Sequence, residues 1–166
     1  MAKKVSPIPE GWHTLSPSLI VRDAAKAIEF YQKAFGAKLL DKHVMPDGKT
    51  IMHASLKIGD SIFMLADEFP EWGAVSPQSQ GGGSASVSLH LYVEDVDSSF
   101  QRALSAGATV KMPVADQFWG DRYGKLIDPF GYGWSIGTRV REVSPAETQK
   151  AAAAFAAPPS DKKRSA

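Results

Sequence analysis

The chain has 166 residues, 43% hydrophobic and 22% charged, as is ordinary for a globular protein with one domain or two small modules. Its formal net charge of +1 gives no electrostatic reason to expect nucleic acid as a partner, and the absence of cysteine excludes disulfides, thiolate metal sites and a cysteine nucleophile. The first residues lack the apolar core of a signal peptide, and no later segment approaches membrane-spanning length. We therefore expect a cytoplasmic protein without a membrane partner.

The first half of the chain reads as one strand, one helix and three further strands. Residues 1–14, rich in Pro, Gly and Lys, predict an irregular arm before this first module, which we place at 15–68. A strand over 16–21 leads to Asp23, a residue type suited to cap a helix, and apolar residues then recur at helical spacing up to Gly36. The three strands that follow are predicted at Lys38–Met45, Ile51–Ile58 and Ser61–Ala66.

Residues 69–85 are predicted to be a flexible linker, because Gly, Pro, Ser and Gln dominate this stretch. The triple glycine at 81–83 does not read as a phosphate-binding loop, since neither a Lys-Ser/Thr pair nor a helix follows it.

A second module, placed at 86–141, repeats the order of the first. The pair Val21 and Asp23 recurs as Val93 and Asp95, which predicts a strand over 88–93 and a capped helix that ends at Gly107. About three strands follow the helix. The last two form a hairpin around the turn Asp128-Pro129-Phe130-Gly131.

The remaining residues, 142–166, are predicted to form a terminal helix and a basic tail. Ser144-Pro145-Ala146-Glu147 is a capping box with proline at the first helical position, so we expect a helix to about Phe155. Pro158-Pro159 would end this helix, and 160–166 would be a frayed basic end.

The doubled pattern resembles the vicinal oxygen chelate superfamily, which includes glyoxalase I, extradiol dioxygenases and bleomycin-binding proteins. The motifs that carry the resemblance are Val-x-Asp before each helix, Phe-Tyr-x-x-Ala-Phe-Gly at 30–36 and Asp-Pro-Phe-Gly at 128–131. Within this superfamily, the stretches 51–54, 59–68 and 118–124 look like the PhnB-like branch. The resemblance implies an α+β fold in which two βαβββ modules form a half-open barrel, followed here by the C-terminal helix, and it implies a homodimer.

Metal-using members of the superfamily carry His or Glu at inner-strand positions of the modules. The resemblance aligns these positions with four serines, namely Ser16, Ser55, Ser88 and Ser135. Because a neutral hydroxyl is a poor ligand beside imidazole or carboxylate, we expect no metal and no cofactor. This disfavours glyoxalase or dioxygenase chemistry, and we lean against an enzyme.

Two histidines complicate this interpretation. Side chains alternate along a strand, so His53 shares a face with Ser55 and His90 with Ser88. They could be displaced metal ligands, general bases, groups that bond a ligand, or ordinary strand histidines. We keep His53 and His90 as catalytic candidates.

Aromatic residues gather around an Asp-Arg pair late in the chain. Arg122 could hold a ligand carboxylate or phosphate while aromatic rings stack on its apolar part, or the pair could simply bridge parts of the structure. We predict a metal-free binding protein whose cup for a small organic ligand is lined by the four serines and by Phe118, Trp119, Asp121, Arg122, Tyr123 and Trp134. Two alternatives stay open: a metal-dependent lyase or isomerase that uses His53 and His90, and an interaction protein in which the dimer and residues 144–157 matter most.

Overall fold

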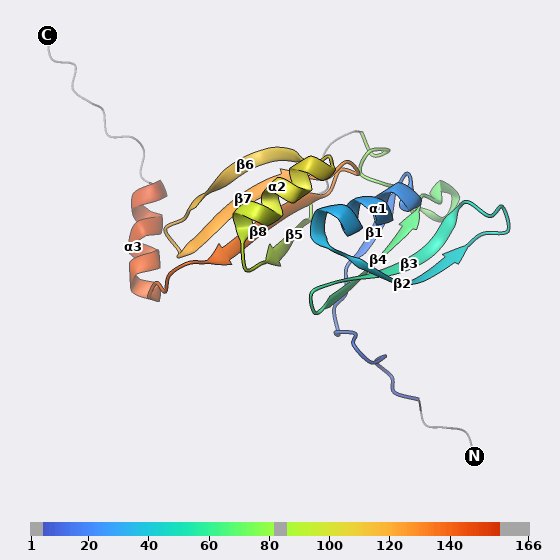
Figure 1. Ribbon diagram of the computed structural model, residues 1–166, viewed down its shortest axis with the longest axis horizontal. Helices are drawn as coiled ribbons and strands as arrows, with labels where there is room; N and C mark the ends of the chain where they lie inside the picture. The colour runs from blue at the N-terminus through green and yellow to red at the C-terminus, as the bar shows by residue number, and fades with distance from the viewer. Residues whose placement is uncertain (1–4, 82–85, 157–166) are drawn as a thin grey trace, which may run out of the picture.

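The protein consists of two successive βαβββ modules and a terminal helix, as the computed structural model shows for residues 5–81 and 86–156 (Figure 1). The first module comprises β1 (Ser18–Val21), α1 (Ala24–Phe35), β2 (Lys38–Val44), β3 (Ile51–Ile58) and β4 (Ser61–Asp67). After a short 3₁₀ helix, η1 (Pro70–Trp72), the second module comprises β5 (Ser88–Tyr92), α2 (Val96–Ala106), β6 (Thr109–Asp116), β7 (Asp121–Ile127) and β8 (Gly133–Arg139). The terminal helix is α3 (Pro145–Ala156).

Each module forms its own four-stranded sheet. The strand orders are β1-β4-β3-β2 and β5-β8-β7-β6, with β1 parallel to β4, β5 parallel to β8, and all other pairs antiparallel. In Figure 1 the helices α1 and α2 meet near the middle of the molecule, where they contact each other. The α+β class with two βαβββ modules and a C-terminal helix is confirmed.

The helix ends follow the signals in the sequence. Asp23 accepts a hydrogen bond from the Lys26 amide at 3.0 Å, and Asp95 accepts one from the Ser98 amide at 3.0 Å. Both helices end at a glycine in the left-handed region, Gly36 with φ of 66° and its counterpart Gly107 with φ of 117°. The same local signals therefore begin and end the helix of each module.

A buried carboxylate ties the two modules together. Asp128 is 4% exposed, and its oxygens accept bonds from Tyr31 Oη at 2.8 Å, from Trp134 Nε1 at 2.8 Å and from the amides of Phe130 and Tyr132 at 2.9 Å each. Burial raises the pKa of Asp128, and the four donors oppose that rise. Because Tyr31 belongs to α1 and the other groups belong to the second module, this network joins both halves of one core.

Aromatic packing also holds the two modules together. The ring of Phe35 lies 4.5 Å from that of Trp134, and the rings of Phe30 and Phe130 lie 5.9 Å apart, centroid to centroid. The hydroxyl of Tyr132 also donates to the carbonyl of Ile20 and accepts from its amide, both at 2.9 Å. The turn at 128–131 is thus anchored to α1 and β1 of the first module.

The predicted linker is partly built into the structure. Ser76 is fully buried, and its amide donates to Glu68 Oε1 at 2.8 Å. Gln78 Nε2 donates to the carbonyl of Pro129 in the second module at 2.7 Å. Residues 82–85, which include most of the triple glycine, lie outside the described residues.

The terminal helix begins at the predicted capping box. The amide of Ser144 donates to Glu147 Oε2 at 2.9 Å, and the Glu147 amide donates to Ser144 Oγ at 3.3 Å. Figure 1 shows α3 beyond β8, at the end of the second module, and its Phe155 is 82% exposed. The proline stop at 158–159 and the basic tail lie outside the described residues. Across 5–81 and 86–156, no helix is long and apolar enough to cross a membrane.

Candidate aromatic binding site

One face of the second sheet is covered by α2, which contacts β6, β7 and β8, and no helix within 5–81 and 86–156 covers the other face. A Cβ placed on Gly124 would lie 2.8 Å from Phe100 Cε2, so this position of β7 faces the helix. Because side chains alternate along a strand, Asp121 and Tyr123 point to the opposite side. The strand register puts His90 of β5 beside Ser135 of β8 on that same side. We call this side the open face.

An aromatic cluster, made of His90, Tyr92, Trp119 and Tyr123, surrounds Asp121 on the open face. Asp121 is 5% exposed, and its Oδ2 accepts from Tyr92 Oη and from Trp119 Nε1, both at 3.0 Å. The ring of Tyr123 lies 5.5 Å from that of Trp119 and 5.8 Å from that of His90, and the rings of His90 and Tyr92 are 4.5 Å apart. One carboxylate therefore fixes two rings that come from different parts of the chain.

The cluster borders a shallow hollow of about 470 Å³, lined by Tyr92, Trp119, Asp121 and Arg139. The hydrogen bond to Asp121 raises the pKa of Tyr92, so its hydroxyl remains a donor at neutral pH. Tyr92 is nevertheless 67% exposed. A ligand can therefore reach a ring whose orientation is already set.

His90 pairs with one of the predicted serines. Its Nδ1 lies 2.8 Å from Ser135 Oγ, and Ser135 is 5% exposed. Desolvation lowers the pKa of His90, and the nearby Asp121 opposes this effect. A neutral imidazole in this place can hydrogen-bond a ligand in either direction.

Arg122 lies on the other side of the sheet. Its Nε and Nη2 donate to Asp97 of α2 at 2.6 and 2.8 Å, and its Nη1 donates to Asp116 at 3.1 Å. Hydrogen bonds to these carboxylates raise the pKa of Arg122. The structure thus places this guanidinium against the helix, apart from Asp121 and Tyr123.

Two other predicted lining residues also lie away from the hollow. Trp134 is 2% exposed and belongs to the core with Asp128. Phe118 extends the cluster toward the terminal helix, with its ring 5.0 Å from Trp119 and 6.0 Å from Phe155.

The four aligned serines do not converge on one place. Ser55 lies in the first sheet, 4% exposed, with its Oγ 2.9 Å from Nε2 of His53. Ser88 opens β5 and donates to the Gly133 carbonyl at 3.3 Å, while Ser16 lies in the arm before β1. Of these four described serines, Ser135 is the one that hydrogen-bonds a member of the aromatic cluster, His90.

The two candidate histidines belong to different sheets, and each contacts its own serine. His53 on β3 also lies opposite His43 on β2, with ring centroids 5.8 Å apart, and His43 Nε2 lies 2.7 Å from Asp41 Oδ2. Among the residues that the structure describes, no three His, Cys, Asp or Glu side chains are grouped so as to hold a metal ion.

Two residues of the hollow were missed in the sequence, Tyr92 and Arg139. Tyr92 is two positions after His90 and so lies on the same face of β5, which the alternation of side chains along a strand could have shown. Arg139 comes to the site because β8 pairs with β7 so that it lies opposite Asp121. The hairpin predicted around 128–131 implies that β7 pairs with β8, but the register that places Arg139 opposite Asp121 was not predicted.

Comparison with known proteins agrees with this architecture. The model of the Glyoxalase/Bleomycin resistance protein/Dioxygenase superfamily matches residues 13–136. An uncharacterized protein of Mycobacterium bovis, Mb0911c, is 52% identical over 140 residues, which cover 82% of this chain and 90% of that protein.

Solved structures show the same fold. TioX from Micromonospora sp. ML1 has 29% sequence identity and a TM-score of 0.60, covering 77% of this chain and 99% of its own. A PhnB protein from Bacillus cereus has 19% identity and a TM-score of 0.60, covering 76% and 99% respectively, and shows similarity of fold. With the repeated module and the matching family model, the chain belongs to the glyoxalase/bleomycin resistance protein/dioxygenase superfamily.

Proposed function

We propose that this protein binds a small organic molecule with a planar aromatic part, without a metal, on the open face of its second sheet. The observation that carries this proposal is the arrangement around Asp121. A nearly buried carboxylate holds Tyr92 and Trp119 in place, while the ring of Tyr92 stays 67% exposed. Members of this superfamily bind small molecules, which is consistent with a ligand at this position.

The chemistry of the hollow favours a ligand with a flat apolar part and a polar edge. Aromatic pairs contribute about 0.5–1.5 kcal/mol beyond the burial of their area, and two or three rings here can contact one ligand. Arg139 lies at the rim, and its side chain is 64% exposed. Its Nη2 is 3.7 Å from Glu142 Oε1. It is therefore available to pair with an anionic group on the ligand.

The test is a ligand screen followed by matched substitutions. Fused-ring aromatic acids and amines are screened by ligand-detected NMR, and dissociation constants are measured for the wild type and for Trp119→Leu and Tyr123→Leu. We expect each substitution to weaken binding by about tenfold, the equivalent of about 1.4 kcal/mol. Trp72→Leu is the control, because it removes an indole that is 67% exposed and that stacks on Phe69, outside the cluster. Equal affinities in all four proteins would reject the aromatic cluster as the site.

The metal-dependent alternative has a separate readout. The purified protein is incubated with Ni²⁺, Zn²⁺ or Mn²⁺, desalted and analysed for metal. We expect no retained metal. Near-stoichiometric metal that is lost in His53→Ala would instead favour a lyase or isomerase built on His53 and His90.

The homodimer and the interaction-protein alternative stay predictions. Light scattering after size exclusion measures the mass of the particle. Comparison of the full chain with a chain that ends before Ser144 shows whether α3 takes part in association. A partner captured only through α3, together with a failed ligand screen, would favour the interaction protein.

A further inference from the structure

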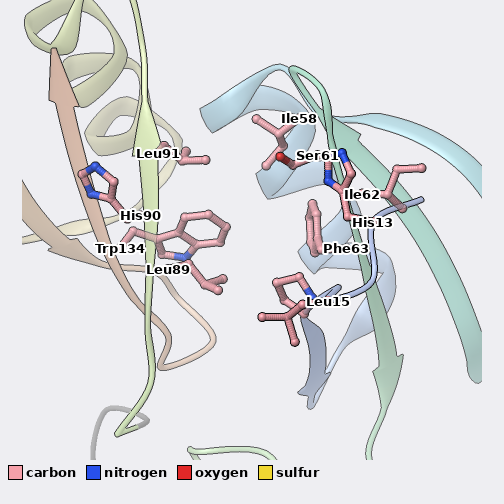
Figure 2. A pocket seen from close by; sticks show the side chains of 11 residues that line it. His13, Leu15, Ile58, Ser61, Ile62, Phe63, Leu89, His90, Leu91 and Trp134 are labelled. Carbon is pink, nitrogen blue, oxygen red and sulfur yellow. The ribbon is translucent and has the colours of Figure 1, made fainter. Parts of the chain in front are cut away.

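A second cavity lies between the two modules, on the side of β5 opposite to the rings of the aromatic cluster. Figure 2 shows Leu89, Leu91 and Trp134 on one wall, directed across a gap toward Phe63 and Leu15 on the other. The cavity measures about 290 Å³ and is partly open to solvent. Its lining residues are His13, Leu15, Pro17, Ile58, Ser61, Ile62, Phe63, Leu89, His90, Leu91 and Trp134. We call it the inter-module pocket.

The walls of this pocket are apolar and carry no permanent charge. None of the described residues that line it is Asp, Glu, Lys or Arg. His90 contributes mainly through its backbone, because it alternates with Leu89 and Leu91, and Figure 2 shows its ring turned away from the gap. The indole nitrogen of Trp134 already donates to Asp128, at 2.8 Å.

Water is poorly held in such a space. A buried water needs two to four polar partners, and the side chains that offer them here, His13 and Ser61, both lie on the first-module side. The hydroxyl of Ser61 also donates to Asp60 Oδ1, at 2.8 Å. Replacing loosely held water by apolar atoms gains about 25 cal/mol for each Å² of apolar surface removed from solvent.

The pocket is assembled from segments that are distant in the sequence. The arm before β1 supplies His13, Leu15 and Pro17, and the carbonyl of Pro17 accepts from the Met64 amide at 2.9 Å, which fixes the base of the arm. Leu15 is 88% exposed and so stands at the mouth. The opening is therefore bounded in part by the arm before β1, whose base is attached to β4.

We propose that the inter-module pocket is a second binding site, which takes a small, neutral, apolar molecule of about one ring. The volume is just below the 300–1,000 Å³ typical of small-ligand pockets, which fits a single ring or a short branched chain. The absence of charged groups among the described lining residues disfavours ions. This site is independent of the proposed function, because the ligand would contact the leucines of β5 rather than the aromatic cluster.

Toluene is the probe for this proposal, and saturation-transfer NMR measures its binding. The wild type is expected to show saturable binding. Leu91→Trp and Ser61→Trp each place an indole in the cavity from opposite walls, and each is expected to weaken toluene binding at least tenfold. Val110→Trp is the matched control, since Val110 lies on β6, is 52% exposed and does not line the pocket.

Near-UV circular dichroism identifies the variants that fold. Ser61 is exposed at the start of β4, so its substitution tests the pocket even if Leu91→Trp does not fold. A wild type without saturable binding, or a folded pocket variant with wild-type affinity, would overturn the proposal. So would binding that is lost in Trp119→Leu while it persists in the pocket variants, because toluene would then sit on the aromatic cluster.

Discussion

Asp128→Asn tests whether the buried carboxylate holds the two modules together. Asparagine keeps the shape of the side chain, and its Oδ1 can still accept from the amides of Phe130 and Tyr132. The side-chain NH₂ of asparagine, however, takes the place of Oδ2, the oxygen that accepts from Tyr31 Oη and Trp134 Nε1. The indole N–H would then face another donor, whereas the tyrosine hydroxyl can rotate to accept.

The expected cost follows from these contacts. A buried N–H without a partner costs about 1–3 kcal/mol, and a hydrogen bond to a charged group contributes about 1.5–3 kcal/mol. The neutral amide avoids the penalty of burying a charge, which is the main reason that the pKa of Asp128 is raised. We therefore expect a net loss of about 2–4 kcal/mol, a large part of the 5–15 kcal/mol typical of a folded protein.

Urea unfolding at neutral pH, followed by circular dichroism, measures this loss. Tyr31→Phe removes one of the four donors and is expected to cost about 1–2 kcal/mol, less than Asp128→Asn. Asp60→Asn, at the exposed turn between β3 and β4, is the matched control and should change stability by less than about 0.5 kcal/mol. If Asp128→Asn were as stable as Asp60→Asn, the carboxylate would not be what joins the modules.

Three further predictions concern single positions. Gly124→Ala would bring a Cβ to 2.8 Å from Phe100 Cε2 and 2.9 Å from Val114 Cγ2, so we expect thermal unfolding to show a loss of about 1–3 kcal/mol, and an unchanged melting temperature would contradict the close contact. Ser144→Ala removes the cap of α3 and should weaken that helix by about 1 kcal/mol, seen as faster amide exchange in its first turn with little change in global unfolding. Because the pKa of His90 is lowered in the folded protein, the unfolded chain binds the proton more readily, and the wild type should lose stability as the pH falls through about 6.5 and below. His90→Asn should reduce the difference between urea midpoints at pH 7.5 and 5.5, and an unchanged difference would contradict this assignment.

The fold could be predicted because its signals are local. Asp23, Asp95 and the Ser144–Glu147 box each contact amides within three residues, so neighbouring positions alone decide the helix starts. The glycine ends and the hairpin turn are equally local. A pattern that repeats twice in one chain then indicates two similar modules.

The positions of the candidate site residues could be predicted only in part, because the face of a strand on which a side chain lies depends on distant packing. Asp121 and Arg122 are neighbours in sequence, yet one lies in the hollow and the other against α2. The close approach of Phe100 to Gly124 shows that the face of β7 that carries Gly124 and Arg122 is the one against α2. The inward direction of Trp134 likewise depends on Asp128 and on the rings of α1, which no spacing along β8 reveals.

The proposed site is tested most directly by mapping the bound ligand on the protein. The tightest compound from the aromatic screen is titrated into isotope-labelled protein, and backbone amide shifts are followed by NMR. We expect the largest changes at Tyr92, Trp119, Asp121 and Tyr123, on the open face. Largest changes at Phe69–Trp72 or along α3, with the open face unaffected, would contradict the proposed site.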